Sequence, residues 1–132
     1  MRLTALCVIA HHLYVKWNIE FHPAFKAEFD ELPLAVQDAL LSLLVPLGER
    51  GPALGRPDVD TLNGSLYANM KELRFRASGG VWRVAFAFDP QRSGILLVAG
   101  DKAGVSEQRF YQRLIAKADK RFKEHLKNIE VQ

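Results

Sequence analysis

The sequence predicts one α+β domain, in the order strand, two helices, three strands and a final helix. Two observations support this prediction. Apolar residues alternate with polar ones in four short segments, as in half-buried strands, and recur every three or four residues elsewhere, as in amphipathic helices. The chain has 132 residues, a length that suits a single compact domain with one core.

The first half is predicted to hold one strand and two helices. The strand covers residues 14–21, and its apolar side consists of Val15, Trp17, Ile19 and Phe21. A helical stripe follows, formed by Phe25, Phe29, Leu32, Val36, Leu40, Leu43 and Leu47. Because proline cannot donate a backbone hydrogen bond, Pro33 should divide the stripe into a short helix and a longer one. The longer helix is expected to end at Gly48. Residues 49–65, which are rich in Gly, Pro and Asp, are predicted to form a loop.

The second half is predicted to hold three strands and a helix. The strands cover residues 66–76, 81–88 and 94–101, and the short links between them indicate antiparallel hairpins. Ser106 is a suitable N-cap for the last helix. Its apolar face is formed by Phe110, Leu114, Ala118, Phe122 and Leu126, and its basic face by Arg113, Lys117, Lys120, Lys123 and Lys127.

Charge is distributed unevenly along the chain. The formal net charge is +3 and the isoelectric point is near 9.2. Residues 1–66 contain fewer basic than acidic residues, whereas residues 67–132 carry the excess of Lys and Arg. A basic half favours a polyanionic partner such as nucleic acid, although many small proteins are mildly basic without one.

The N-terminus is interpreted as an extension. Residues 3–10 form a short apolar run that lacks the flanks of a signal peptide and is too short to span a membrane. Residues 1–14 are therefore expected to be an extension or to follow an early start codon, partly disordered, with the single domain covering residues 15–132. The one cysteine, Cys7, cannot form an intramolecular disulfide, which fits a cytoplasmic protein.

Several common kinds of site are not indicated by the sequence. The four histidines, His11, His12, His22 and His125, lack the spacing of zinc ligands. No glycine-rich phosphate loop precedes a helix, and no carboxylate cluster suggests bound magnesium. We therefore expect neither a metal nor another cofactor.

Basic residues gather on the predicted strands. Alternation places Arg74, Arg76 and Arg83 on the side of the sheet that faces away from the core. Lys71 falls inward by the same rule and would need a bulge or a strand end to join them, whereas Lys102 lies just after the last strand. Such a set suits phosphate binding, since guanidinium groups donate bidentate hydrogen bonds to phosphate oxygens. A solvated, charged sheet face is the alternative interpretation.

Three segments together resemble a known family. They are residues 62–67 (LNGSLY), residues 71–74 (KELR) with 82–86 (WRVAF), and residues 100–111 from GDKAGVS to QRFY. In this order and spacing they resemble HigB-like (phage Gp49-like) toxins of the RelE/ParE superfamily, over roughly residues 16–127. The resemblance implies a RelE-like curved antiparallel sheet of about four strands, with two N-terminal helices and a C-terminal helix packed on one side.

The resemblance also implies a function. Such toxins are endoribonucleases (mRNA interferases) that cut mRNA on the ribosome, leaving a 2′,3′-cyclic phosphate. They are neutralised by a cognate antitoxin, usually with a helix-turn-helix domain, so that DNA is contacted only through the antitoxin. Arg83 then matches the scissile-phosphate ligand, Lys102 a general acid or base, and Arg74 a phosphate ligand or structural residue. RNA-binding roles are assigned to Arg76 by alternation, to Lys71, and to Tyr111 as a base-stacking ring, although packing is the commoner role at its position.

The chain departs from the family pattern at the end of the last strand. Asp101 and Ala103 flank Lys102 where many members have several lysines, and no histidine or tyrosine stands there as a base.

Two alternatives to the nuclease remain open. A ParE-like toxin that poisons DNA gyrase would share the fold without nuclease residues. A non-catalytic module that only binds its antitoxin is the third possibility.

Overall fold

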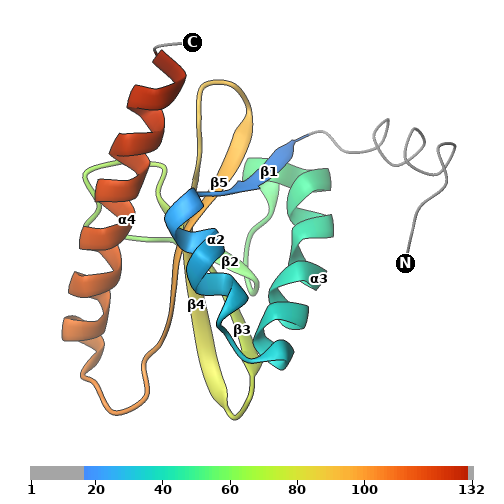
Figure 1. The fold of residues 1–132 in the computed structure, drawn as a ribbon, viewed down its shortest axis with the longest axis vertical. Coiled ribbons are helices and arrows are strands. Elements are labelled where there is room, and N and C mark those ends of the chain that lie inside the picture. Colours follow the sequence, from blue (N-terminus) through green and yellow to red (C-terminus); the bar gives the residue numbers. More distant parts are fainter. Residues whose placement is uncertain (1–16, 131–132) are drawn as a thin grey trace, which may run out of the picture.

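The computed structural model describes residues 17–130, and the expectations for residues 1–14, Cys7 included, lie outside this range. The elements are strand β1 (Asn18–Phe21), helices α2 (Pro23–Asp30) and α3 (Leu34–Arg50), a 3₁₀ turn η1 (Gly51–Ala53), strands β2 (Val59–Thr61), β3 (Lys71–Ala77), β4 (Gly80–Phe88) and β5 (Ser93–Asp101), and helix α4 (Glu107–Glu130). The predicted α+β class and the order of the main elements are confirmed (Figure 1).

The strands form one five-stranded sheet in the order β1-β5-β4-β3-β2. The hairpins β3–β4 and β4–β5 are antiparallel, as predicted, and β2 adds an antiparallel edge. Two features differ from the prediction. The short strand β2 lies inside the segment expected to be a loop, and β1 runs parallel to β5 rather than antiparallel. Pairing at a sheet edge depends on residues distant in sequence, which a local pattern does not contain.

Helices cover both faces of the sheet, whereas the family resemblance implied helices on one side. Val84 and Phe86 of β4 pack in a core with α2 and α3. Ala85 and Ala87 of the same strand pack in a second core with α4. The strand β4 is buried on both faces along most of its length, so the domain has three layers, with α3 and α4 flanking the strands (Figure 1).

The boundaries of α2 and α3 follow from proline and glycine. Pro33 is the residue before α3, as predicted. The helix continues past Gly48 to Arg50 and ends at Gly51, whose φ of +56° suits glycine. A Cβ at Gly51 would lie 2.3 Å from the indole of Trp17, so close packing as well as backbone conformation requires glycine here.

The segment before β3 is held by α4 rather than by the sheet. Strand β3 begins at Lys71, not at residue 66 as predicted. The backbone N–H of Leu66 donates to the carboxylate of Asp119 on α4 at 3.0 Å, and the hydroxyl of Ser65 donates to the same carboxylate. These bonds hold residues 65–67 in a bend instead of an extended ladder.

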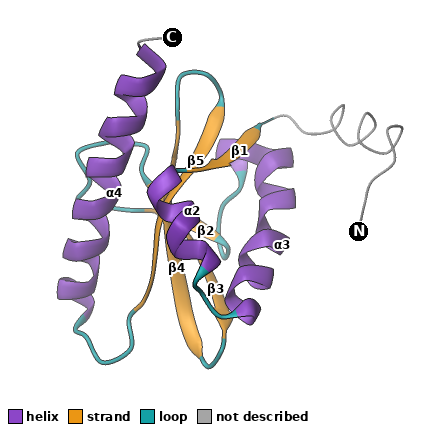
Figure 2. Cartoon of the chain, viewed as in Figure 1, coloured by secondary structure: helices purple, strands orange, loops and turns teal. Residues whose placement is uncertain are grey.

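Helix α4 is one uninterrupted helix that crosses the whole length of the sheet (Figure 2). Ser106 caps it as predicted, because its Oγ accepts a hydrogen bond from the backbone of Arg109 at 3.3 Å. In the part of the chain from residue 17 to residue 130, no helix has the length and apolar character needed to cross a bilayer.

Candidate functional site

Two of the predicted site residues are neighbours across the sheet. Arg74 of β3 is paired directly with Arg83 of β4, and Arg83 is paired in turn with Gly100 of β5. Directly paired residues point to the same face, so both arginines lie on the face that α4 covers, together with Arg76 two residues along β3. The alternation argument for these three arginines is therefore confirmed.

That face is not open at Arg83. The Arg83 side chain is only 6% exposed, because the first turns of α4 lie over it. Its guanidinium lies 5.4 Å from the ring centre of Phe110 and 5.8 Å from that of Tyr111. Its Nε donates to the Tyr111 hydroxyl at 2.9 Å and its Nη1 donates to the Val81 carbonyl at 3.1 Å. The expectation that Arg83 faces away from the core is wrong, since strand alternation selects a side of the sheet and not what covers that side.

Glu72 completes a buried polar cluster with Arg83 and Tyr111. The Tyr111 hydroxyl accepts from Arg83 and donates to Glu72 Oε1 at 2.9 Å, and the Glu72 carboxylate lies 3.9 Å from Arg83 Nε. Sequence reasoning missed Glu72, although alternation places it on the same side as Arg74. Its carboxylate offsets one positive charge of the arginine pair.

Burial controls the protonation of this cluster. It raises the pKa of Glu72, an effect that the Tyr111 hydrogen bond and the charges of Arg74 and Arg83 oppose. Burial also raises the pKa of Tyr111, and the hydrogen bond to Glu72 acts in the same direction. Tyr111 therefore keeps its proton at neutral pH and serves as a hydrogen-bond donor. Its ring packs edge-on against Phe110.

The remaining cations of the predicted set differ in position. The Arg74 side chain is 46% exposed and borders a small pocket with Arg56, Pro57 and Asp60. Arg76 is exposed farther along β3. Lys102 is half-buried and follows β5 directly, two residues beyond Gly100, the residue paired with Arg83.

Lys71 does not join this group. It is paired with Phe86, whose side chain belongs to the core under α2 and α3, and its Nζ lies 3.4 Å from the carbonyl of Pro52 after α3. No bulge intervenes in β3 to turn it, so strict alternation holds and Lys71 lies on the opposite face from Arg74.

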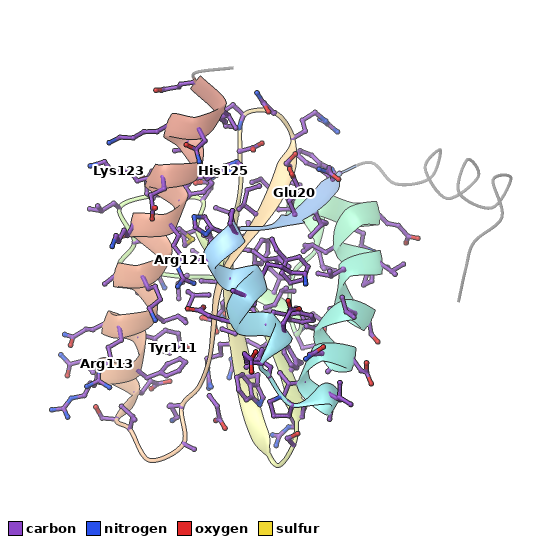
Figure 3. All side chains as sticks on the ribbon, in the orientation of Figure 1. Glu20, Tyr111, Arg113, Arg121, Lys123 and His125 are labelled. Atoms are coloured by element: carbon purple, nitrogen blue, oxygen red, sulfur yellow. The ribbon has the colours of Figure 1, made fainter. Side chains whose placement is uncertain are left out.

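A second polar connection, also missed from the sequence, joins α4 to α2. Arg121 is buried on α4 and forms two hydrogen bonds to the Glu28 carboxylate, at 2.8 and 2.6 Å, and a third to the carbonyl of Leu97 at 2.8 Å (Figure 3). Leu97 has no register partner in β4, because the pairing shifts between Ala85–Val98 and Phe86–Leu96, and Arg121 supplies its carbonyl with a hydrogen bond. The Arg121 hydrogen bonds hold the pKa of Glu28 below its ordinary value.

The two histidines in the described range have structural partners. His22 caps α2 by accepting a hydrogen bond from the backbone of Ala24, and burial lowers its pKa. His125 Nε2 lies 2.7 Å from Oδ2 of Asp89 in the β4–β5 hairpin. Between residues 17 and 130, no group of three or more His, Cys, Asp or Glu side chains is arranged to hold a metal ion.

Comparison with known proteins identifies relatives. The chain is 52% identical over 85 residues to a Mycobacterium tuberculosis protein named "Putative toxin HigB2", an alignment that covers 64% of this chain and 42% of that protein. It is 54% identical over 71 residues to "Putative toxin HigB3" of the same organism, covering 54% of this chain and 60% of that protein. The matches thus span about half the length of these curated relatives.

The sequence profile of the family described as phage derived protein Gp49-like (DUF891) matches residues 27–123. This range extends from α2 into the second half of α4 and includes the row of Arg74, Arg83 and Gly100. The protein therefore belongs to the phage-derived Gp49-like family and is HigB-like, as its central motifs predicted.

Proposed function

We propose that this protein is the toxin of a type II toxin–antitoxin pair and acts in the cytoplasm as an endoribonuclease on mRNA bound to the ribosome. The family match and the names of the two relatives support the toxin assignment. The partner is then a cognate antitoxin carrying a helix-turn-helix domain. The catalytic part of the proposal rests on the placement of the basic residues.

The observation that carries the proposal is a row of residues across three adjacent strands. Arg74, Arg83 and Gly100 are consecutive register partners, and Lys102 follows two residues beyond Gly100. Residues two apart on a strand are separated by about 6–7 Å. The three residues proposed to be catalytic, Arg74, Arg83 and Lys102, thus come from one end of one sheet, despite their distance in the sequence.

These residues suit a reaction that needs positioning and charge stabilisation. In the proposed step the 2′-hydroxyl of the RNA loses its proton and attacks the neighbouring phosphorus, and the 5′-oxygen leaves and gains a proton. The products are a 2′,3′-cyclic phosphate and a 5′-hydroxyl. The nucleophile belongs to the substrate, so exposed cations that bind the phosphate provide most of what the protein must supply.

Each residue then has a distinct role. Arg74 and Arg76, both exposed, bind the phosphates, and Lys102 transfers a proton near the scissile bond. Arg83 stabilises negative charge from beneath, in surroundings where burial strengthens electrostatic interactions. Direct contact between Arg83 and a phosphate would require the start of α4 to move, because Phe110 and Tyr111 lie over the guanidinium and leave the side chain only 6% exposed. Lys71 lies on the other face and has no role in this arrangement.

The test avoids Arg83, because Arg83→Ala would remove a buried side chain that hydrogen-bonds Tyr111 and lies 3.9 Å from the Glu72 carboxylate, and would therefore destabilise the fold. Arg74→Gln and Lys102→Gln are expressed in a sensitive host, and mRNA cleavage is mapped by primer extension with and without translation. Loss of one charge-stabilising group should lower cleavage by about 10²–10³-fold. Arg50→Gln, at an exposed position at the end of α3, is the control and should retain full activity.

The outcomes separate the three candidate functions. Translation-dependent cleavage that both variants lose supports the nuclease. Gyrase inhibition without cleavage would establish the ParE-like alternative. Binding to the antitoxin without toxicity would establish the non-catalytic module.

A further inference from the structure

The outer face of α4 carries a continuous stripe of positive charge that the proposed cleavage site does not use. Its six residues, here called the α4 stripe, are Arg109, Arg113, Lys117, Lys120, Lys123 and Lys127, all of them exposed. Successive members are three or four residues apart, so on a helix they fall within an arc of about 120° along roughly 27 Å. Figure 3 shows Arg113 and Lys123 pointing away from the sheet, whereas Tyr111 and Arg121 point toward it.

The stripe differs from an ordinary solvated helix face. Such faces usually mix acids and bases four residues apart, which pair with each other. Of the four acidic residues in α4, only Glu124 falls within the arc, and none of the six basic residues forms an ion pair with another residue in the range 17–130. The positive charge is therefore not neutralised within the domain.

This helix accounts for the whole net charge of the protein. It contains seven basic and four acidic residues, a net +3, which equals the net charge of the full chain. The rest of the chain is balanced. Concentration of charge along one helix is the electrostatic pattern of a surface that binds a nucleic-acid backbone.

The stripe also lacks what a protein interface requires. Stable protein interfaces are centred on buried apolar or aromatic side chains. The large apolar side chains exposed between residues 17 and 130 are Leu34, Leu41, Val45 and Leu66, three on α3 and none on α4. A polyanion held by charge alone fits the α4 stripe better than an acidic protein does.

We infer that the α4 stripe binds the phosphate backbone of double-helical RNA, outside the site where cleavage is proposed. The choice of RNA over DNA, and of ribosomal RNA in particular, rests on the proposed function, because a nuclease that acts on the ribosome must dock beside ribosomal RNA helices. Binding of the stripe to a nucleic-acid backbone rests on its charge alone. Contact is with phosphates and sugars rather than base edges, so affinity should be independent of sequence and sensitive to salt.

The test measures binding of the full chain to a fluorescent 20-base-pair RNA duplex over a range of KCl concentrations. Lys117, Lys120 and Lys123 are changed together to Gln in one variant. Removal of three phosphate contacts should flatten the slope of log Kd against log salt by about 2–3 units. The matched control changes Lys26, Arg50 and Arg56 to Gln, three exposed residues outside α4, and removes the same charge.

Further arms keep the result decisive. Circular dichroism and Tm should match the wild type in both variants, and changing the three lysines to Arg should restore the salt slope. Equal slopes in the α4 variant and the control would overturn the inference. Two other results would overturn it as well. One is tighter binding of the wild type to a DNA duplex of the same length than to the RNA duplex, and the other is a loss of polyglutamate binding in the α4 variant while its RNA binding is unchanged. If duplex binding depends on the stripe but no cleavage is found, the inference stands and the proposed nuclease fails.

Discussion

The hydroxyl of Tyr111 accepts a hydrogen bond of 2.9 Å from Nε of Arg83, which joins the first turns of α4 to the middle of the sheet. The same hydroxyl donates to Glu72, so one phenol bridges two buried charges of opposite sign. This bridge explains why α4 seats at this point on the sheet, since each charged group would otherwise be buried without a hydrogen-bond partner on that side.

Tyr111→Phe should therefore destabilise the protein while preserving its shape. The change removes two hydrogen bonds to charged groups, and we expect a loss of about 2–3 kcal/mol in the free energy of unfolding. Urea denaturation followed by circular dichroism measures it. Tyr67→Phe is the matched control, because the Tyr67 hydroxyl has no hydrogen-bond partner within residues 17–130 and its ring already packs on Phe122. Equal effects of the two changes would contradict the bridging role.

Arg121→Met should destabilise the protein by about 2–4 kcal/mol. The variant keeps apolar bulk but removes the Arg121 hydrogen bond to the Leu97 carbonyl, at the irregularity between β4 and β5, and the contact between α4 and α2. Lys120→Met, at the neighbouring exposed position, should change stability by about 0.5 kcal/mol or less. Thermal unfolding of both variants compares them, and a mild effect of Arg121→Met would show that the Leu97 carbonyl is satisfied by water.

The Glu28–Arg121 pair predicts how stability varies with pH. The pKa of Glu28 is lowered below its ordinary value of 4.5 in the folded protein, so the unfolded chain binds the proton more readily. The contribution of the pair is complete above pH 4.5 and is lost as the pH falls through the lowered folded-state pKa. The stability difference between wild type and Glu28→Gln should therefore be largest near neutrality and shrink toward pH 3.

This pH dependence is measured by urea denaturation of both proteins at several pH values. Glu49→Gln is the control, since Glu49 is exposed and forms no ion pair in the range 17–130. A constant difference between wild type and Glu28→Gln across the range would rule out the pair as the source.

Gly51→Ala should cost about 2–4 kcal/mol, for two reasons that act together. A side chain is strained at a φ of +56°, and its Cβ would overlap the Trp17 ring. Gly55→Ala is the control, because no atom lies within 4 Å of a Cβ placed there. If both variants had the same Tm, the packing of Trp17 against the end of α3 would not contribute to stability.

Local patterns predicted most elements because the signals that form them are local. Pro33 divides the two helices because it has no backbone N–H to donate, and Ser106 caps the last helix by accepting a hydrogen bond from the backbone of Arg109 three residues on. The errors fall where distant segments meet. The end of α3 is at Gly51 rather than Gly48 because the Trp17 indole packs where a Gly51 Cβ would lie, and β2 becomes a strand only because β3 lies beside it.

Side-chain alternation was enough to place Arg74 and Arg83 on one face and Lys71 on the other, since the period of a strand is fixed by its backbone. The sequence by itself also determined the family, through the order and spacing of its short motifs. Only the tertiary structure decided that α4 covers Arg83 and brings Tyr111 and Glu72 to it. The packing of a helix on a sheet depends on the summed fit of many distant side chains, which no single segment of the sequence records.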